Sequence, residues 1–180
     1  FRRRQNLCKL ADFARARLYG VKAMNDMSGH WRFSIHSNSR TFAFVLLPGF
    51  SLLALSGAME VLRHANQVVG EPLYEWPLYS ETGGEVLSSS GVHVQTSGAI
   101  TEVPPDANVI HVGGTNVIRA ASQKLLHWLR RVAVHGPLIG ALCSATRVLA
   151  EAGLLAGHRA TIHWELSESL RETFPDIAIT

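Results

Sequence analysis

The sequence predicts an α/β fold, in which a doubly wound and mostly parallel sheet carries helices on both faces. From Thr41 onward, short apolar runs alternate with segments of helical periodicity, as repeated β–α units require. Two of the apolar runs end in turns that contain glycine, Pro48-Gly49 and Gly113-Gly114. Ligands of such sheets bind beyond the carboxyl ends of the strands, so these turns mark the expected position of a site.

The predicted elements follow one another from residue 42 to residue 180. An apolar strand covers 42–48, and an amphipathic helix covers 52–69 and ends at Gly70. Pro77 favours a sheet edge or a bend in the next strand, 73–80. After these come a small hairpin (85–97), a buried strand (107–114), a long helix (116–135), a strand (137–142), a helix (144–153), a strand (159–163), a helix (164–174) and a last strand (176–180).

Composition narrows the class of protein. A chain of 180 residues can bury a substantial core as one domain. Its two cysteines, Cys8 and Cys143, provide neither a disulfide framework nor metal-ligand spacing, so we expect a cytoplasmic protein without a metal or another cofactor. No window has the length of a membrane helix and no secretory signal is present, so we expect no membrane partner.

Charge divides the chain into two regions. Residues 1–40 hold nine Lys/Arg and two Asp, net +7, whereas residues 41–180 hold eight Lys/Arg and twelve Asp/Glu, net −4. We expect 1–40 to be a basic, poorly ordered extension, with Met24 or Met27 as the native start, although such a segment can also contact nucleic acid or an anionic membrane. The acidic region gives no electrostatic case for binding DNA. Because Thr180 lies inside an apolar strand, we expect a domain truncated at its C-terminal end.

Cys143 is the first candidate for chemistry. In "PLIGALCSATRVLA" (137–150) it lies where a strand turns into a helix, and unpaired N–H groups at a helix start stabilise a thiolate. His163 is its candidate base, and the N–H groups of Gly113, Gly114 and Ser144 are candidate oxyanion donors. The alternative is structural: a buried cysteine, a tight glycine turn and an ordinary histidine.

The order of these motifs resembles a known family. Pro48-Gly49, Gly113-Gly114, the Cys143 elbow and "AEAGLLAGHRATIHWE" are similar to the ThiJ/PfpI-like branch of the class I glutamine amidotransferase-like fold. More narrowly, "LLPGFSLLALSGAMEVLRHAN" with "AGLLAGHRATIHWE" resembles the sensory half of GlxA-like, AraC-type transcriptional regulators, over residues 41–180. The resemblance implies that DNA is bound only through a C-terminal helix-turn-helix domain absent from this chain.

Two departures from the family pattern concern catalysis. Enzymes of the superfamily carry an acidic residue after the first strand, but the corresponding position here is about Ala54 and residues 50–56 contain no acid. Glu60 is the first acid, and a pairing with Arg63 explains it. Ala141 and Ala145 occupy elbow positions where amidotransferase-type sequences often have glycine. The pattern favours a pocket that keeps its shape without turnover.

The leading hypothesis is therefore a ligand-sensing domain. The resemblance implies a small nitrogenous effector, amino-acid-like or quaternary-ammonium-like, since the regulators it points to often govern amino-acid, betaine or carnitine use. Trp164 and Glu165 beside His163 can face a cationic head group, although hydrophobic anchoring also explains Trp164. The candidate ligand-binding residues are Gly49, Gly113, Gly114, Cys143, Ser144, His163 and Trp164.

Two alternatives stay open. One is a cysteine-dependent hydrolase, amidase or hydratase of the same fold, with Cys143 and His163 as catalytic residues. The other is a homodimerisation platform on the 52–69 helix, using Leu52, Leu55, Met59 and Leu62, which core packing explains equally well.

Overall fold

The computed structural model describes residues 22–25, 31–34, 40–115, 117–134 and 138–180. The chain divides into two compact units, Phe1–Asn38 and Ser39–Thr180. In the first unit, strand β1 (Lys22–Asn25) pairs antiparallel with β2 (Trp31–Ser34). The rest of the expected N-terminal extension, including Cys8, lies outside the described residues.

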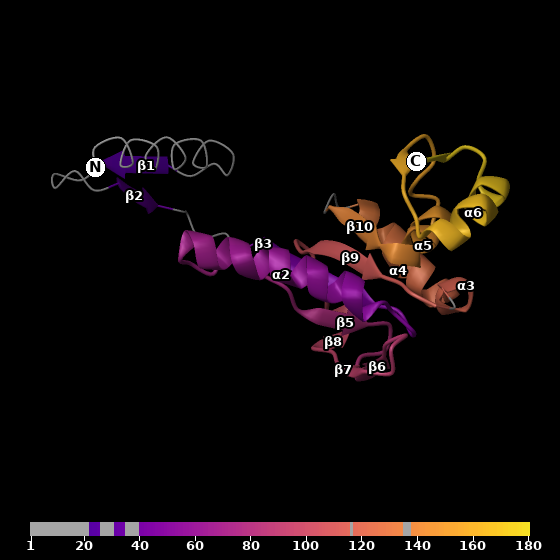
Figure 1. Ribbon diagram of the computed structural model, residues 1–180, viewed down its shortest axis with the longest axis horizontal. Coiled ribbons are helices and arrows are strands. Elements are labelled where there is room, and N and C mark those ends of the chain that lie inside the picture. Colours follow the sequence, from indigo (N-terminus) through magenta and orange to yellow (C-terminus); the bar gives the residue numbers. More distant parts are fainter. Residues whose placement is uncertain (1–21, 26–30, 35–39, 116, 135–137) are drawn as a thin grey trace. The chain divides into compact units, whose positions relative to one another are not determined.

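The second unit is built on a parallel sheet (Figure 1). Its strand order is β10-β9-β3-β5-β8, with β4 beside the start of β3. The bounds are β3 Arg40–Leu46, β4 Tyr74–Glu75, β5 Leu78–Ser80, β8 Gly98–Ala99, β9 Asn108–Val112 and β10 Ile139–Leu142. The chain adds β5 and β8 on one side of β3 and then crosses to add β9 and β10 on the other. The crevice between β3 and β9 is therefore the switch point where such sheets bind ligands.

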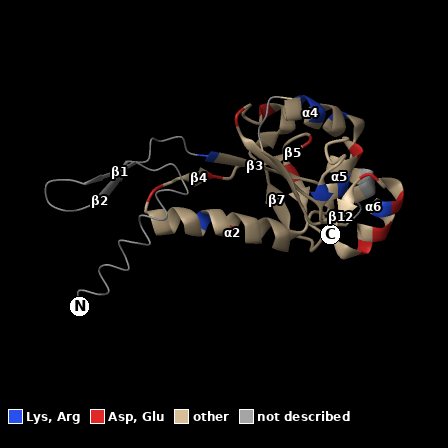
Figure 2. Cartoon of the chain, turned by 90° about the horizontal axis from the view of Figure 1, so that it is seen from above, with Lys and Arg blue, Asp and Glu red and all other residues tan. Residues whose placement is uncertain are grey.

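Helices cover both faces of this sheet, as predicted. Phe44, Leu46 and Val112 form a core cluster with α2 (Leu52–Val69) on one face. Val45 and Val109 face the other cluster, which includes residues of α4 (Gln123–Val134) and α5 (Thr146–Glu151). Figure 2 shows α2 and α4 on opposite sides of the sheet. This alternation is what strands buried on both faces require.

Helix α2 has the bounds that the sequence predicts. Ser51 accepts a hydrogen bond from the N–H of Ala54 at 3.3 Å, and Gly70 ends the helix in the left-handed conformation. Its inward residues Leu52, Leu55, Met59 and Leu62 pack in the core cluster with Phe44. Leu55 is buried and the other three are half-buried, so core packing accounts for part of the surface of each, and the dimerisation alternative is not tested by these contacts.

The middle of the unit shows the interruption that Pro77 predicts, and it contains two elements that the sequence did not predict. The 73–80 strand is divided at Pro77 into β4 and β5, because proline has no N–H to donate to a ladder. β6 (Glu85–Leu87) and β7 (His93–Gln95) form the predicted hairpin, but β8 and the 3-10 helix Ile100–Glu102 that follow it are unpredicted.

The predicted long helix 116–135 is two helices. α3 covers Val117–Ala120 and α4 begins at Gln123, while residues 116 and 135–137 lie outside the described residues. The Oγ of Ser122 accepts from the N–H of Leu125 at 3.0 Å, and its carbonyl accepts from Leu126. Ser122 thus starts a new helix where helical periodicity alone predicts continuation.

The C-terminal elements are shorter than predicted. A 3-10 turn, η2 (Cys143–Ala145), precedes α5, and the 159–163 strand is reduced to β11 (Arg159–Ala160). β11 pairs with β12 (Ala178–Ile179) in a separate two-stranded parallel sheet. Between them lie η3 (Trp164–Leu166) and α6 (Ser167–Thr173). None of the helices in the described part of the chain combines the length and the apolar composition of a membrane span.

Candidate functional site

A cavity of about 550 Å³ opens beyond the carboxyl ends of the parallel strands. This volume falls within the range typical of small-molecule sites, about 300–1,000 Å³. The wall combines hydroxyl groups, one thiol, one imidazole, one carboxylate and two aliphatic side chains. It is formed by Ser51, Ser89, Gly114, Thr115, Val117, Cys143, Ser144, His163, Glu165 and Leu166.

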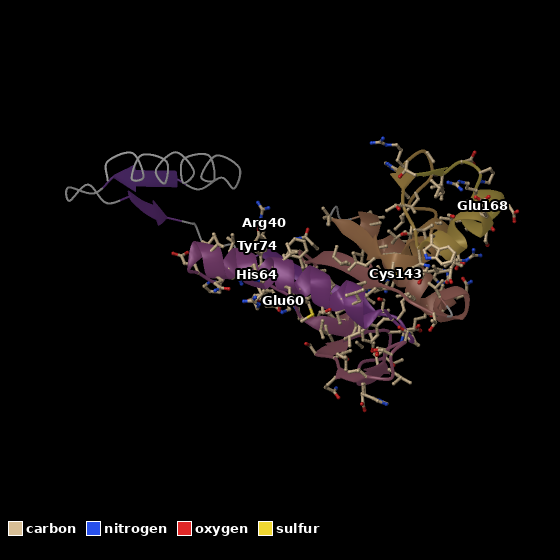
Figure 3. All side chains as sticks on the ribbon, in the orientation of Figure 1. Arg40, Glu60, His64, Tyr74, Cys143 and Glu168 are labelled. Atoms are coloured by element: carbon tan, nitrogen blue, oxygen red, sulfur yellow. The ribbon has the colours of Figure 1, made fainter. Side chains whose placement is uncertain are left out.

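Cys143 sits on a strained turn directly after β10 (Figure 3). Its φ angle is 59°, and among the described residues it is the one non-glycine residue with positive φ. Such a conformation costs on the order of 1–3 kcal/mol and persists where the surrounding structure enforces it. Here the enforcement includes the buried Ser144, whose Oγ donates to the carbonyl of Gly114 at 2.7 Å. The predicted elbow is therefore present, with the half-buried thiol on the cavity wall.

The two glycines after β9 allow this elbow to pack closely. A Cβ on Gly113 would lie 2.5 Å from the amide nitrogen of Ala145, and a Cβ on Gly114 would collide with the carbonyl oxygen of Gly49. The N–H of Gly113 donates to the carbonyl of Leu142 at 3.2 Å. Gly113 is thus not an available oxyanion donor, contrary to the expectation from sequence. Gly114 does line the cavity, and no described residue accepts from its N–H.

Gly49 has a structural position next to the site. Its N–H donates to the carbonyl of Leu87 at 2.9 Å, and its carbonyl accepts from the N–H of Thr115 at 3.0 Å. Neither Gly49 nor Gly113 belongs to the cavity wall. Both residues shape the turns that place Ser51 and Gly114 there.

His163 reaches the cavity from a loop and not from the main sheet. Its N–H donates to the carbonyl of Cys143 at 3.3 Å, and the hydroxyl of Thr146 holds the same loop through the carbonyl of Thr161 at 2.8 Å. These two bonds attach the start of η3 to the elbow. The sequence predicts the proximity of His163 to Cys143 correctly but assigns it to the end of a sheet strand, which is wrong.

The charged end of the cavity is formed by η3. The Nδ1 of His163 lies 3.7 Å from the Oε2 of Glu165, with the side chains 37% and 64% exposed. This distance is compatible with an ion pair and too long for a hydrogen bond. Trp164 stacks at a tilt on the ring of His163, 5.8 Å between centroids, but is 75% exposed and does not line the cavity. The structure therefore brings Glu165 to the site in place of Trp164.

Residues 40–177 match the model of the DJ-1/PfpI family. The chain belongs to the DJ-1/PfpI family. Over 142 residues it is 39% identical to the HTH-type transcriptional regulator CdhR of Pseudomonas aeruginosa, covering 79% of this chain and 42% of the relative. It is 36% identical over 141 residues to the HTH-type transcriptional regulator GlxA of Rhizobium meliloti, covering 78% and 44%.

A solved structure agrees with these relatives. The AraC family transcriptional regulator from Pseudomonas putida superposes with a TM-score of 0.69 and 28% identity, covering 78% of this chain and 76% of that chain. The present chain spans about two-fifths of the length of the curated regulators it matches. The resemblance to AraC-type regulators with a ThiJ/PfpI-like domain is thereby confirmed.

In this DJ-1/PfpI unit, the segment that follows β3, residues 50–56, contains no Asp or Glu. Ala54 lies in the first turn of α2, packs against the core cluster that contains Phe44, and is not part of the cavity wall. The side chain that lines the wall from this turn is Ser51. Glu165 is the carboxylate of the wall, and no group of three or more His, Cys, Asp and Glu that could hold a metal occurs among the described residues.

Sequence reasoning did not identify five further wall residues, Ser51, Ser89, Thr115, Val117 and Leu166. Ser89 lies on the wall because its N–H donates to the carbonyl of Phe50 at 2.9 Å. This hydrogen bond fixes the hairpin turn against the end of β3. Thr115 simply follows Gly114. For Ser51 and Thr115, the available signal was their place just after the strands that flank the switch point.

Proposed function

We propose that the Ser39–Thr180 unit is the ligand-sensing module of a cytoplasmic transcriptional regulator, and that it acts together with a C-terminal helix-turn-helix domain. The observation that carries this proposal is the cavity at the switch point of a domain similar to CdhR and GlxA. A sensor needs a shaped cavity and a polar wall, and it has no need of a complete catalytic set. We include a homodimer in this proposal, without assigning its surface.

The wall chemistry supports a small nitrogenous cation or zwitterion as the effector. Glu165 supplies a negative charge, and no Lys or Arg lines the described wall. The hydroxyls of Ser51, Ser89 and Thr115, together with the free N–H of Gly114, can bind the oxygen atoms of a carboxylate or an alcohol. We therefore assign recognition of the positive group to Glu165 and His163. Trp164 is not required.

The proposal is tested with matched probes on the purified chain. Glycine betaine and choline carry a trimethylammonium group, and 3,3-dimethylbutanoate and 3,3-dimethylbutanol are their uncharged-carbon isosteres. A ligand at about 100 times its Kd adds about 2.7 kcal/mol to stability, which is roughly 5–10 °C in Tm for a chain of this size. We expect an increase in Tm with at least one of the two trimethylammonium compounds and no increase with its carbon isostere.

Variants then locate the contact. Glu165→Gln should abolish the shift, whereas Trp164→Ala should retain most of it. Glu168→Gln is the matched control, because Glu168 is an exposed carboxylate on α6 that pairs with Arg171 at 2.6 Å, away from the wall. A shift that survives Glu165→Gln, or that occurs equally with the isosteres, would contradict the assignment.

A second candidate is a cysteine-dependent hydrolase, amidase or hydratase. It is favoured by one observation: a thiol, an imidazole and a carboxylate share the wall of one cavity. The missing acid at Ala54 and the 3.7 Å separation argue against efficient proton transfer. We expect negligible turnover of amides, isocyanides or α-oxoaldehydes. Robust turnover that disappears in Cys143→Ala would replace the sensor with the enzyme.

A further inference from the structure

The charges of the folded unit are segregated along the chain. Between Asp106 and Glu151 the sequence contains no acidic residue. Yet five of the eight Lys/Arg in residues 41–180 lie in this stretch, namely Arg119, Lys124, Arg130, Arg131 and Arg147. The net charge of −4 is thus an average over a basic segment and acidic surroundings.

Helix α4 presents several of these charges to solvent. Lys124, His127 and Arg131 are exposed and follow each other at the i, i+3, i+7 spacing of one helix face. They span about 10 Å along the helix axis. The buried residues Leu125, Leu126, Trp128 and Leu129 hold the other side of α4 against the core. Figure 2 shows blue segments on α4, which lies across the sheet from α2.

Two cations of α4, Lys124 and Arg130, form no ion pair with a carboxylate of the described residues. The Nε and Nη2 of Arg130 donate to the backbone carbonyls of Ala152 and Glu151, at 3.1 and 3.0 Å. The carboxylate of Glu151 is engaged by Arg147 at 2.9 Å. Among the ion pairs of the described residues, none involves Lys124 or Arg130. By contrast, Arg63 and Arg171 each pair with a glutamate.

We propose that the basic face of α4, formed by Lys124, His127, Arg130 and Arg131, contacts the phosphate backbone of duplex DNA. Duplex DNA carries one charge per about 1.7 Å of its axis when both strands are counted, so a length of about 10 Å of duplex carries about six phosphate charges, about three on each strand. The net negative charge of the unit predicts no contact with DNA. The net charge does not determine the local charge of a single helix face, however. The choice of DNA rests on the regulatory role proposed above, whereas the cavity and its ligand are not involved.

The test is the salt dependence of DNA binding by the full chain. The affinity for a duplex of arbitrary sequence is measured by fluorescence anisotropy between about 50 and 200 mM salt. The slope of log K against log salt falls by about 0.9 for each lost phosphate contact, so Lys124→Gln/Arg131→Gln should reduce its magnitude by about 1.8. Arg63→Gln/Arg159→Gln removes the same charge outside α4 and should leave the slope unchanged.

Further arms make the outcome decisive. Lys124→Arg/Arg131→Lys keeps both charges and should keep the parent slope. Equal slopes for the parent and Lys124→Gln/Arg131→Gln, or equal losses in the α4 variant and the charge-matched control, would overturn the proposal. So would an effect of the α4 variant on binding to anionic lipid vesicles but not to DNA. The ligand-induced Tm shift of Lys124→Gln/Arg131→Gln, measured in parallel, reports on the sensing function separately.

Discussion

His111 lies in the middle of β9 with its side chain fully buried, and no described group hydrogen-bonds either ring nitrogen. Its ring meets that of Trp128 edge to face, 6.1 Å between centroids. Burial disfavours the imidazolium and lowers the pKa of His111 from 6.5 to about 4. The core therefore holds a neutral imidazole, and leaving each buried polar group unpaired costs about 1–3 kcal/mol.

This buried imidazole should make stability depend on pH. The unfolded chain binds a proton at His111 below pH 6.5, whereas the folded chain does so only below about pH 4. The contribution of His111 to the free energy of unfolding is therefore fully present above pH 6.5. It decreases by roughly 3 kcal/mol as the pH falls from 6.5 to about 4. His111→Leu should raise the free energy of unfolding by about 1 kcal/mol near neutral pH and remove this part of the decrease.

Urea unfolding at about pH 7.5 and about pH 5 measures both effects. His158→Leu, an exposed position, is the control and should retain the parent pH dependence. A less stable His111→Leu at neutral pH would mean that the ring nitrogens make favourable bonds in the native state.

Individual site residues differ in how far the sequence can predict them. Cys143 and His163 are predictable, because a thiol at a strand-to-helix turn and a histidine at a fixed distance along the chain have chemical meaning. Ser51, Ser89 and Thr115 of the wall are not, since hydroxyl residues occur in most turns and nothing local says which turn faces a cavity. Trp164 attracts attention by its size, yet the orientation of η3 leaves it exposed and places the neighbouring Glu165 on the wall.

Elements with local signals at both ends are predicted best. Helix α2 has an amphipathic period, Ser51 at its start and Gly70 at its end, and the predicted bounds are observed. β11 is shorter than its apolar run because the chain leaves it for the loop that carries Thr161 to Thr146. Such a tertiary hydrogen bond has no signal in the local sequence.

The break between α3 and α4 gives a direct test of one missed signal. Ser122→Ala removes the hydroxyl that accepts from Leu125 and should lower the free energy of unfolding by about 1 kcal/mol. Ser56→Ala is the matched control, since Ser56 lies inside α2 and alanine favours a helix interior; it should be neutral or slightly stabilising. Chemical denaturation of the three proteins compares them. A stable Ser122→Ala would indicate that the two helices have joined, as periodicity alone predicts.

The chain as a whole combines two units, and its net charge describes neither of them. The first unit, Phe1–Asn38, holds eight Lys/Arg and two Asp, net +6, while the second, Ser39–Thr180, holds nine Lys/Arg and twelve Asp/Glu, net −3, with no acid between Asp106 and Glu151. Sequence composition captures the first division because it runs along the chain. The second division also runs along the chain, but which of these charges share one face is known only after folding selects the side of α4 that is buried.

Deletion of the first unit tests how far the second is self-sufficient. The core clusters of the described residues begin at Phe42, so removal of residues 1–38 should leave Tm within about 2 °C of the parent, a change of less than about 1 kcal/mol. Deletion of residues 1–42 is the comparison. It removes the pairing of Arg40 and Thr41 with β4 and the hydrogen bond from Asn108 to the carbonyl of Thr41, and should lower Tm by several degrees. Differential scanning calorimetry on the three chains distinguishes them. A large decrease already at the first deletion would show that the N-terminal unit stabilises the DJ-1/PfpI unit, because every contact of β3 is still present in that chain.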